Sequence, residues 1–91
     1  MDKQIAIDIS QNALLYIIEK EEEFYKFIDI SGTDINNIRN NFNNEIFLSS
    51  ILEYIMSWEP LLLKISEARN IEGEDFQKAF ITLGGKLINS L

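Results

Sequence analysis

Apolar residues recur at intervals of three and four along most of this chain, and no stretch alternates apolar and polar residues as a half-buried strand would. One proline and four glycines leave long segments without a helix breaker. The first apolar series predicts a helix with a broad buried face, made of Ile5, Ile9, Ala13, Tyr16 and Ile17 and widened by Leu14 and Ile18. The sequence therefore predicts an all-α fold, a compact bundle of five to six short helices.

Charged and polar residues predict where these helices begin. Glu21–Glu23 suit the first turn of a second helix, because the helix dipole favours negative charge there. No proline or glycine marks the join, so one continuous helix is the alternative. Asn43 or Asn44 is expected to cap a fourth helix, and Ser57 a fifth helix with Pro60 in its first turn. The fourth helix is expected to turn inward Phe47, Leu48, Ile51, Leu52, Tyr54, Ile55, Met56 and Trp58. The fifth is expected to turn inward Leu61, Leu62, Ile65 and Ala68. The sixth is expected to turn inward Phe76, Ala79, Phe80 and Leu83 and to end near Gly84-Gly85.

Length and composition narrow the possible functions. The 91 residues predict one domain, 1–91, and a chain of this size buries roughly 60–65% of its unfolded surface. The net charge of −7 argues against nucleic acid and against an anionic membrane surface as partners. The absence of histidine and cysteine removes the commonest general base and the usual zinc ligands. The N-terminus lacks the pattern of a signal peptide, so a cytoplasmic location is expected.

The segment DISGTD, residues 29–34, places two aspartates around a glycine and resembles part of a calcium loop. An EF-hand loop needs oxygen ligands at positions 1, 3, 5 and 12 and glycine at position 6, and neither a start at Asp29 nor one at Asp34 satisfies this pattern. The segment instead predicts a corner between two helices: Gly32 ends one in the left-handed conformation, Thr33 caps the next, and Asp34 lies in its first turn. Arg39 is expected to form an ion pair with a nearby acid. No metal or cofactor is expected.

The same corner has the spacing of a helix-turn-helix, with Ile35 and Ile38 facing inward on the short second helix. Asn36, Asn37 and Asn40 could then read base edges. Against DNA binding stand the acidic balance, the acids just upstream and the presence of one cation, Arg39, on the short helix. Any helical hairpin with a glycine corner produces the same spacing.

Four residues are candidates for a contact with a partner protein or a second copy of the chain: Ile7, Leu14, Ile18 and Trp58. The apolar arc of the first helix is broader than a small bundle can cover, and leftover apolar surface tends to mark an interface. Aromatic residues such as Trp58 anchor interfaces, although at helical spacing they belong more often to a core. A monomer whose first helix is simply part of the core is the alternative.

The runs FIDISGTDINNIR and FLSSILEYIMSWEPLLLKI resemble a small alphaproteobacterial family of unknown function. The pattern of that family is an F-L-x-L-T-G corner, then D-x-x-x-L-R, then F-L-x-x-V-L-x-F-L, an acid and a leucine triplet. The chain departs from it at Lys20-Glu21 and at Ile35, where that family has proline. The resemblance implies a fold and a lineage, and it assigns no activity. The residues that fit are Phe27, Ile28, Gly32, Asp34, Ile38, Arg39, Phe47, Leu48, Leu52, Tyr54, Ile55, Glu59 and Leu61–Leu63.

Three classes of function remain at this point. A non-enzymatic interaction or self-association module is favoured, an acidic helix-turn-helix regulator is second, and an enzyme that works with carboxylates alone is third. An exposed apolar patch would favour the first class, and a concave pocket lined by several acids would favour the third.

Overall fold

A computed structural model describes residues 1–86, and in this part of the chain six α-helices and no strands are formed. The all-α prediction is therefore confirmed. The helices are α1 (Lys3–Glu19), α2 (Glu21–Ser31), α3 (Ile35–Asn40), α4 (Glu45–Met56), α5 (Glu59–Arg69) and α6 (Gly73–Thr82). The radius of gyration is 12.3 Å, close to the value of about 12 Å expected for a compact chain of this length.

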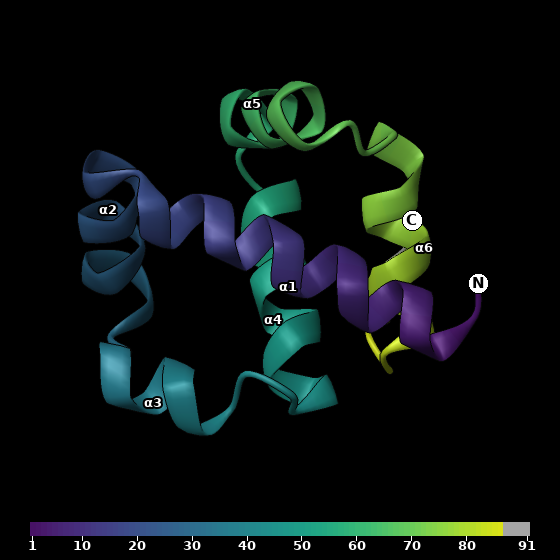
Figure 1. Ribbon diagram of the computed structural model, residues 1–91, viewed down its shortest axis with the longest axis horizontal. Coiled ribbons are helices and arrows are strands. Elements are labelled where there is room, and N and C mark those ends of the chain that lie inside the picture. The colour runs from purple at the N-terminus through teal and green to yellow at the C-terminus, as the bar shows by residue number, and fades with distance from the viewer. Residues whose placement is uncertain (87–91) are drawn as a thin grey trace, which may run out of the picture.

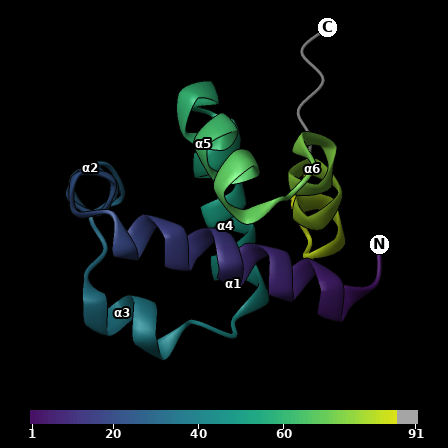
Figure 2. The same cartoon turned by 45° about the horizontal axis from the view of Figure 1, so that its top comes forward.

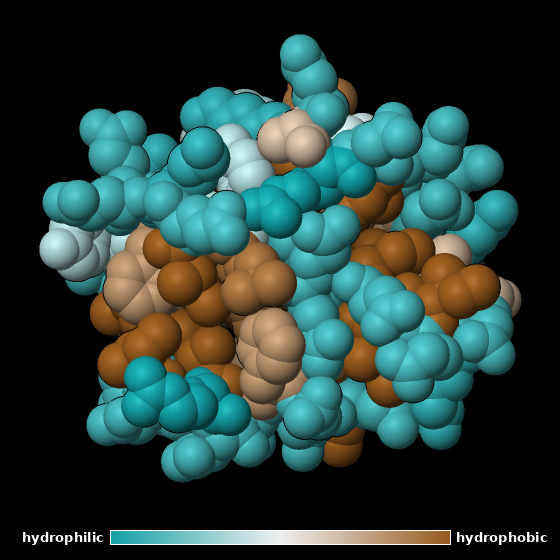
Figure 3. Space-filling view, in the orientation of Figure 1, coloured by the Kyte–Doolittle hydropathy of each residue, from teal (hydrophilic) through white to brown (hydrophobic). Residues whose placement is uncertain are grey.

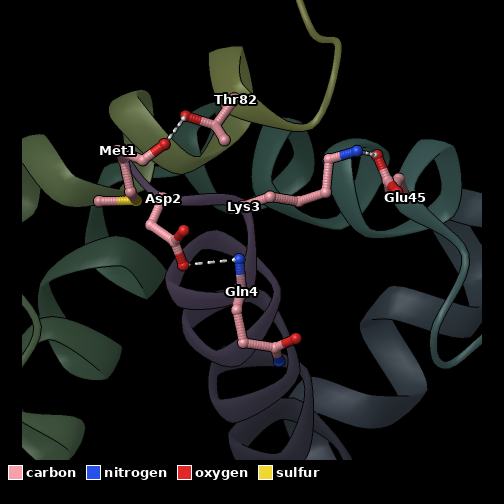
Figure 4. Close-up of polar contacts among 6 residues, drawn as sticks. All are labelled: Met1, Asp2, Lys3, Gln4, Glu45 and Thr82. Atoms are coloured by element: carbon pink, nitrogen blue, oxygen red, sulfur yellow. Dashed lines mark hydrogen bonds and ion pairs between the residues drawn. The ribbon is translucent and has the colours of Figure 1, made fainter.

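Helix α1 crosses the molecule, with α4 behind it, α6 near its N-terminal half and α2 at its far end (Figures 1 and 2). Its start is fixed by Asp2, whose carboxylate accepts hydrogen bonds from the backbone N–H groups of Gln4 and Ile5. Figure 4 shows how this end is tied to the rest of the fold: the Met1 carbonyl accepts a hydrogen bond from Thr82 at 3.5 Å, and the Lys3 ammonium lies 3.4 Å from the Glu45 carboxylate. The N-terminal residues therefore join α1 to α6 and α4.

The boundary between α1 and α2 lies at Lys20, whose extended backbone separates the two helices, as expected from the acids that follow it. Gly32 ends α2 with φ of 71°, so the predicted left-handed corner is confirmed. The next cap was assigned to the wrong residue. Asp34, not Thr33, caps α3, because its carboxylate accepts the Asn37 N–H at 2.8 Å.

The junction between α4 and α5 also differs from the prediction. Asn44 caps α4, one of the two residues expected to do so. Ser57 does not cap α5, because it ends α4 and its hydroxyl donates to the Tyr54 carbonyl. Trp58 precedes the first residue of α5, outside helix α4, and Pro60 lies in the first turn of α5 as expected.

The core lies where α1, α4, α5 and α6 meet. The C-terminal half of the predicted α1 face is confirmed, since Ala13, Leu14, Tyr16 and Ile17 are buried. In the N-terminal half the buried face is rotated from the predicted one, because Ala6 is buried and Ile5 is exposed. Ser10 is tolerated in the core because its hydroxyl donates to the Ala6 carbonyl at 2.7 Å. Ala68 of α5 is exposed, contrary to the prediction, and the predicted inward residues of α6 are all buried.

Helices α2 and α3 form an arm that is attached mainly through side chains. The backbone of α2 comes close to α1 alone among the described helices, and that of α3 comes close to none of them. Phe27 and Ile38 are the buried apolar residues of the arm. The α3–α4 loop is joined to α1 by Gln11, whose side-chain amide donates hydrogen bonds to the Phe42 carbonyl and to the Asn43 side chain.

Among residues 1–86, no single helix is long and apolar enough to cross a membrane. Helices α4 and α5 reach that length and apolar content only when counted together, across a bend of 110°.

Candidate functional site

An apolar pocket of about 450 Å³ opens between α2 and the corner that joins α4 to α5. Lys26 and Ile30 come from α2, Tyr54 from α4, and Ser57 and Trp58 from the corner. Two large apolar residues of this pocket are exposed to solvent: Ile30 is 71% exposed and Trp58 is 50% exposed. The sequence analysis had placed Trp58 on the inward face of the fourth helix, and that assignment is wrong.

Local structure explains why these side chains meet. Lys26 and Ile30 are four residues apart on α2 and so lie on one face of that helix. The end of α4 at Met56 leaves Trp58 on the corner instead of in the helix. The Tyr54 ring packs edge-on against the buried Phe27, with 5.1 Å between the ring centroids. The pocket wall is therefore anchored to the core through an aromatic pair.

A second, acidic pocket of about 480 Å³ lies at the other end of α2. It is lined by Tyr16, Glu19, Lys20, Glu21, Glu22, Glu23 and Lys64. Glu19 and Glu23 are already paired within the fold, with Arg69 and Lys64 respectively. Glu21 and Glu22 are exposed in the first turn of α2.

Glu23 is the unusual residue of this pocket, because its side chain is only 8% exposed. Its Oε2 atom accepts a hydrogen bond from the Lys64 ammonium at 3.1 Å, whereas its Oε1 atom has no donor among residues 1–86. A buried acceptor without a partner typically costs about 1–3 kcal/mol, and more when the group is charged. The fold therefore holds a carboxylate oxygen that a bound donor would stabilise.

The Tyr16 ring forms another wall of the acidic pocket and has two cations near it. The Lys20 ammonium is 5.5 Å from the ring centroid, and the Arg69 guanidinium is 5.9 Å from it. Arg69 also donates to the Asn12 side chain at 3.0 Å. Lys20 and Arg69 are therefore both engaged in contacts within the fold.

The two pockets influence each other through Tyr54 and Glu23. Burial raises the pKa of the Tyr54 hydroxyl above its usual value, and the nearby Glu23 charge raises that pKa further. The hydroxyl therefore stays protonated at neutral pH and can donate a hydrogen bond. The charge of Glu23 in the acidic pocket therefore acts on the pKa of Tyr54 in the apolar pocket.

Both pockets adjoin α2, and each includes one residue from α5 or from the position just before it. The acidic pocket, at the start of α2, includes Lys64 of α5, and the apolar pocket, toward the end of α2, includes Trp58, the residue before α5. The Lys64–Glu23 pair is the only side-chain hydrogen bond or ion pair that joins α2 to α5 in the described part of the chain. We call the two pockets together the α2–α5 groove.

The residues predicted on the first helix do not form one surface. Leu14 is fully buried in the core, so it is unavailable for the contact expected of it. Ile7 and Ile18 are partly buried against the core. The large apolar residues that α1 does expose are Ile5 and Leu15, which the sequence analysis had not selected as contacts.

The face shown in Figure 3 carries apolar side chains in two areas separated by a hydrophilic band. Comparison with Figure 1 places one area over the arm and the adjoining half of α1, and the other over the N-terminal half of α1 and α6. Each area includes part of α1, so the surface of α1 is a second candidate for a contact with a partner.

The corner residues lie away from both pockets. Gly32, Thr33 and Asp34 form the α2–α3 turn, and Asn37 donates to the Thr33 hydroxyl at 2.6 Å. Arg39 forms no ion pair with any residue in the range 1–86, contrary to the expected pairing. No group of three or more acidic side chains in this range is arranged to hold a metal ion.

Sequence reasoning missed most residues of the groove. Glu23, Phe27 and Ile30 recur at intervals of four and three, and this spacing places them on one face of α2. An apolar residue and an acid on the same inward face could have drawn attention to the site.

Comparison with known sequences places this chain in a family. The family model described as "Protein of unknown function (DUF3572)" matches residues 3–86. The chain belongs to the DUF3572 family. This match covers all six helices and both pockets, and it confirms that the chain resembles a family without an assigned function. No curated protein and no solved structure matches this DUF3572 chain.

Proposed function

We propose that this DUF3572 protein is a non-enzymatic interaction module that binds a partner protein through the α2–α5 groove. The observation that carries the proposal is the exposure of Trp58 and Ile30 beside each other in an apolar pocket. Tryptophan is enriched among the residues that dominate binding energy, and a concave apolar site with a few polar groups is the usual form of a binding pocket. The contact is proposed to form in the bacterial cytoplasm.

The acidic pocket is lined by several acids, an arrangement that would favour an enzyme. Glu23 and Glu19 are engaged by Lys64 and Arg69, and the other two acids lie at an exposed helix start. Acid–base catalysis needs a group placed to move a proton at a reacting atom, and carboxylates already held in ion pairs suit charge recognition better. This arrangement supports binding in preference to catalysis.

DNA binding receives no support from the α2–α3 corner. Helix α3 has six residues and carries one cation, Arg39. Asn37 of this helix accepts a hydrogen bond from the side chain of Asn41, the residue that follows the helix. A recognition helix needs several free side chains that reach base edges or phosphates.

The test is affinity capture from native lysate with the full chain and three matched variants. Trp58→Ala removes the anchor of the groove, Leu15→Ser changes the exposed surface of α1, and Ile46→Ser changes an exposed isoleucine outside both surfaces. We expect one set of captured proteins to be lost with Trp58→Ala and retained with the other two variants. Loss with Leu15→Ser alone would move the contact to α1, and equal capture by all three variants would refute a specific surface.

Self-association is the narrower form of the same proposal, with a second copy of the chain as the partner. Symmetric dimers are the commonest oligomers, and α1 exposes Ile5 and Leu15. Light scattering at tens of micromolar protein measures the mass directly. A dimer that dissociates with Leu15→Ser but not with Trp58→Ala would assign self-association to α1 and leave the groove for another protein.

A further inference from the structure

The α2–α5 groove has two chemically different ends, and this difference specifies the kind of partner. The inference rests on the proposed function. We infer that the groove binds a protein segment that carries a lysine or arginine and a large apolar side chain, with the cation at Glu23 and the apolar side chain against Trp58.

The acidic end provides the site for the cation. Glu23 is nine-tenths buried, and its Oε1 atom has no donor among residues 1–86. The neighbouring acids add negative potential, and the chain as a whole carries a net charge of −7. Because Oε1 is itself enclosed, a lysine or arginine of a partner would reach this carboxylate by taking the place of Lys64, in a pocket where glutamates outnumber lysines by four to two.

Lys64 marks this position as one that accepts a cation. Its ammonium occupies Oε2 of Glu23 at 3.1 Å, yet 58% of its side chain is exposed. A long, largely exposed side chain can move into water once another cation takes its place, whereas its departure alone would leave the buried carboxylate without a partner. The internal ion pair is therefore a competitor that an incoming cation can replace.

The apolar end fixes the direction in which the partner binds. Ile30 and Trp58 offer apolar surface, whereas Lys26 on the same wall repels a second cation. The partner's positive charge is therefore directed to Glu23 and its apolar side chain to Trp58.

The geometry of α2 sets the spacing between the two groups. Glu23 and Ile30 are seven residues apart, which corresponds to about 10 Å along the helix. A partner helix matches that distance with its two groups about seven residues apart, and an extended segment with about three.

The experiment pans the full chain against a displayed library of random 12-residue peptides and measures the recovered peptides by calorimetry. We expect sequences in which a lysine or arginine accompanies a large apolar residue at one of these two spacings. Glu23→Gln and Trp58→Ala should each weaken their binding about tenfold or more, as loss of a charged hydrogen bond or of an interface anchor does. Ile46→Ser is the control and should leave binding unchanged.

Lys64→Met distinguishes a binding role of Glu23 from a merely structural one. Removal of the competing internal cation should tighten the binding of the basic peptides several-fold, and Glu23→Gln in the same chain should abolish that gain. A fold damaged by the loss of the ion pair would instead bind more weakly.

The remaining outcomes separate this inference from the proposed function. Peptides without basic residues that depend on Trp58 but not on Glu23 would overturn the inference and leave the groove as an interaction surface. Peptides that bind regardless of Trp58, or a library that yields no enriched sequence, would overturn both the inference and the use of this groove.

Discussion

The two sides of the molecule are built differently. Helices α1, α4 and α6 approach each other closely by their backbones and bury most of the fully enclosed side chains. The arm of α2 and α3 is attached by a few side chains, chiefly Phe27, Ile38 and the bridge from Gln11. Both pockets lie where the arm faces the rest of the fold. The most closely packed part of the molecule is thus the centre formed by α1, α4 and α6, and the candidate binding site lies at the border of the α2–α3 arm. Binding surfaces are often found in such less stable regions.

The largest expected effect comes from removing a buried aliphatic side chain from each of the two sides. Leu52→Ala in α4 is expected to lower the free energy of unfolding by roughly 2–5 kcal/mol, because the close-packed helices cannot collapse onto the cavity. Ile38→Ala in α3 is expected to cost less, because α3 can shift toward the vacated space. Urea unfolding followed by circular dichroism measures both. Equal losses would show that the arm is as rigidly packed as the centre.

The second test concerns the corner inside the arm. Gly32→Ala is expected to destabilise the protein by roughly 1–2 kcal/mol, because a Cβ is penalised in the left-handed conformation. No atom of a residue beyond its two chain neighbours lies within 4 Å of the added carbon, so the cost is conformational and does not come from a tertiary clash. Gly73→Ala, at a helix start with ordinary backbone angles, is the matched control and should change stability far less. A neutral Gly32→Ala in urea unfolding would contradict the corner geometry.

The third test weakens the attachment of the arm to α1. Gln11→Ala removes hydrogen bonds to the Phe42 carbonyl and the Asn43 side chain, and we expect a loss of about 0.5–1.5 kcal/mol. The loss should be local, since the bridge joins only the α3–α4 loop to α1. Amide hydrogen exchange in α3 should therefore accelerate more than exchange in α6. Uniform acceleration across all helices would mean that the arm and the centre unfold as one unit.

Helical periodicity predicted most of the fold because burial of one face of each helix depends mainly on local spacing. The inward face of α6 was predicted correctly for this reason. The end of α2 at Gly32 was predicted from the left-handed freedom of glycine, and Asn44 was one of two asparagines expected to cap α4. The rotation of α1 that buries Ala6 in place of Ile5 was not predictable, because it depends on how closely neighbouring backbones approach. The groove was missed for a related reason: α2 and α5 are far apart in sequence, and only the tertiary fold brings Glu23 to Lys64.

The smallest effect tests whether the two pockets are electrically coupled. Burial, and then Glu23, raise the pKa of Tyr54 in the folded state, whereas the unfolded value stays at about 10. Below about pH 10 the hydroxyl is protonated in both states and contributes nothing to the pH dependence; as the pH rises further, the unfolded state loses the proton first and the free energy of unfolding falls.

Tyr54→Phe keeps the ring against Phe27 and should reduce this alkaline loss, measured by urea unfolding at about pH 9 and pH 11. Glu23→Gln should lower the Tyr54 pKa only in part, because burial is the larger cause. The chain has three tyrosines, so the Tyr54 titration is followed as the difference in phenolate absorbance between chains with and without Tyr54→Phe. An unchanged Tyr54 titration in Glu23→Gln would mean that the Glu23 carboxylate is not felt in the apolar pocket. The cation and the apolar side chain of a partner would then contribute independently to its affinity, and the effects of Glu23→Gln and Trp58→Ala on binding should add.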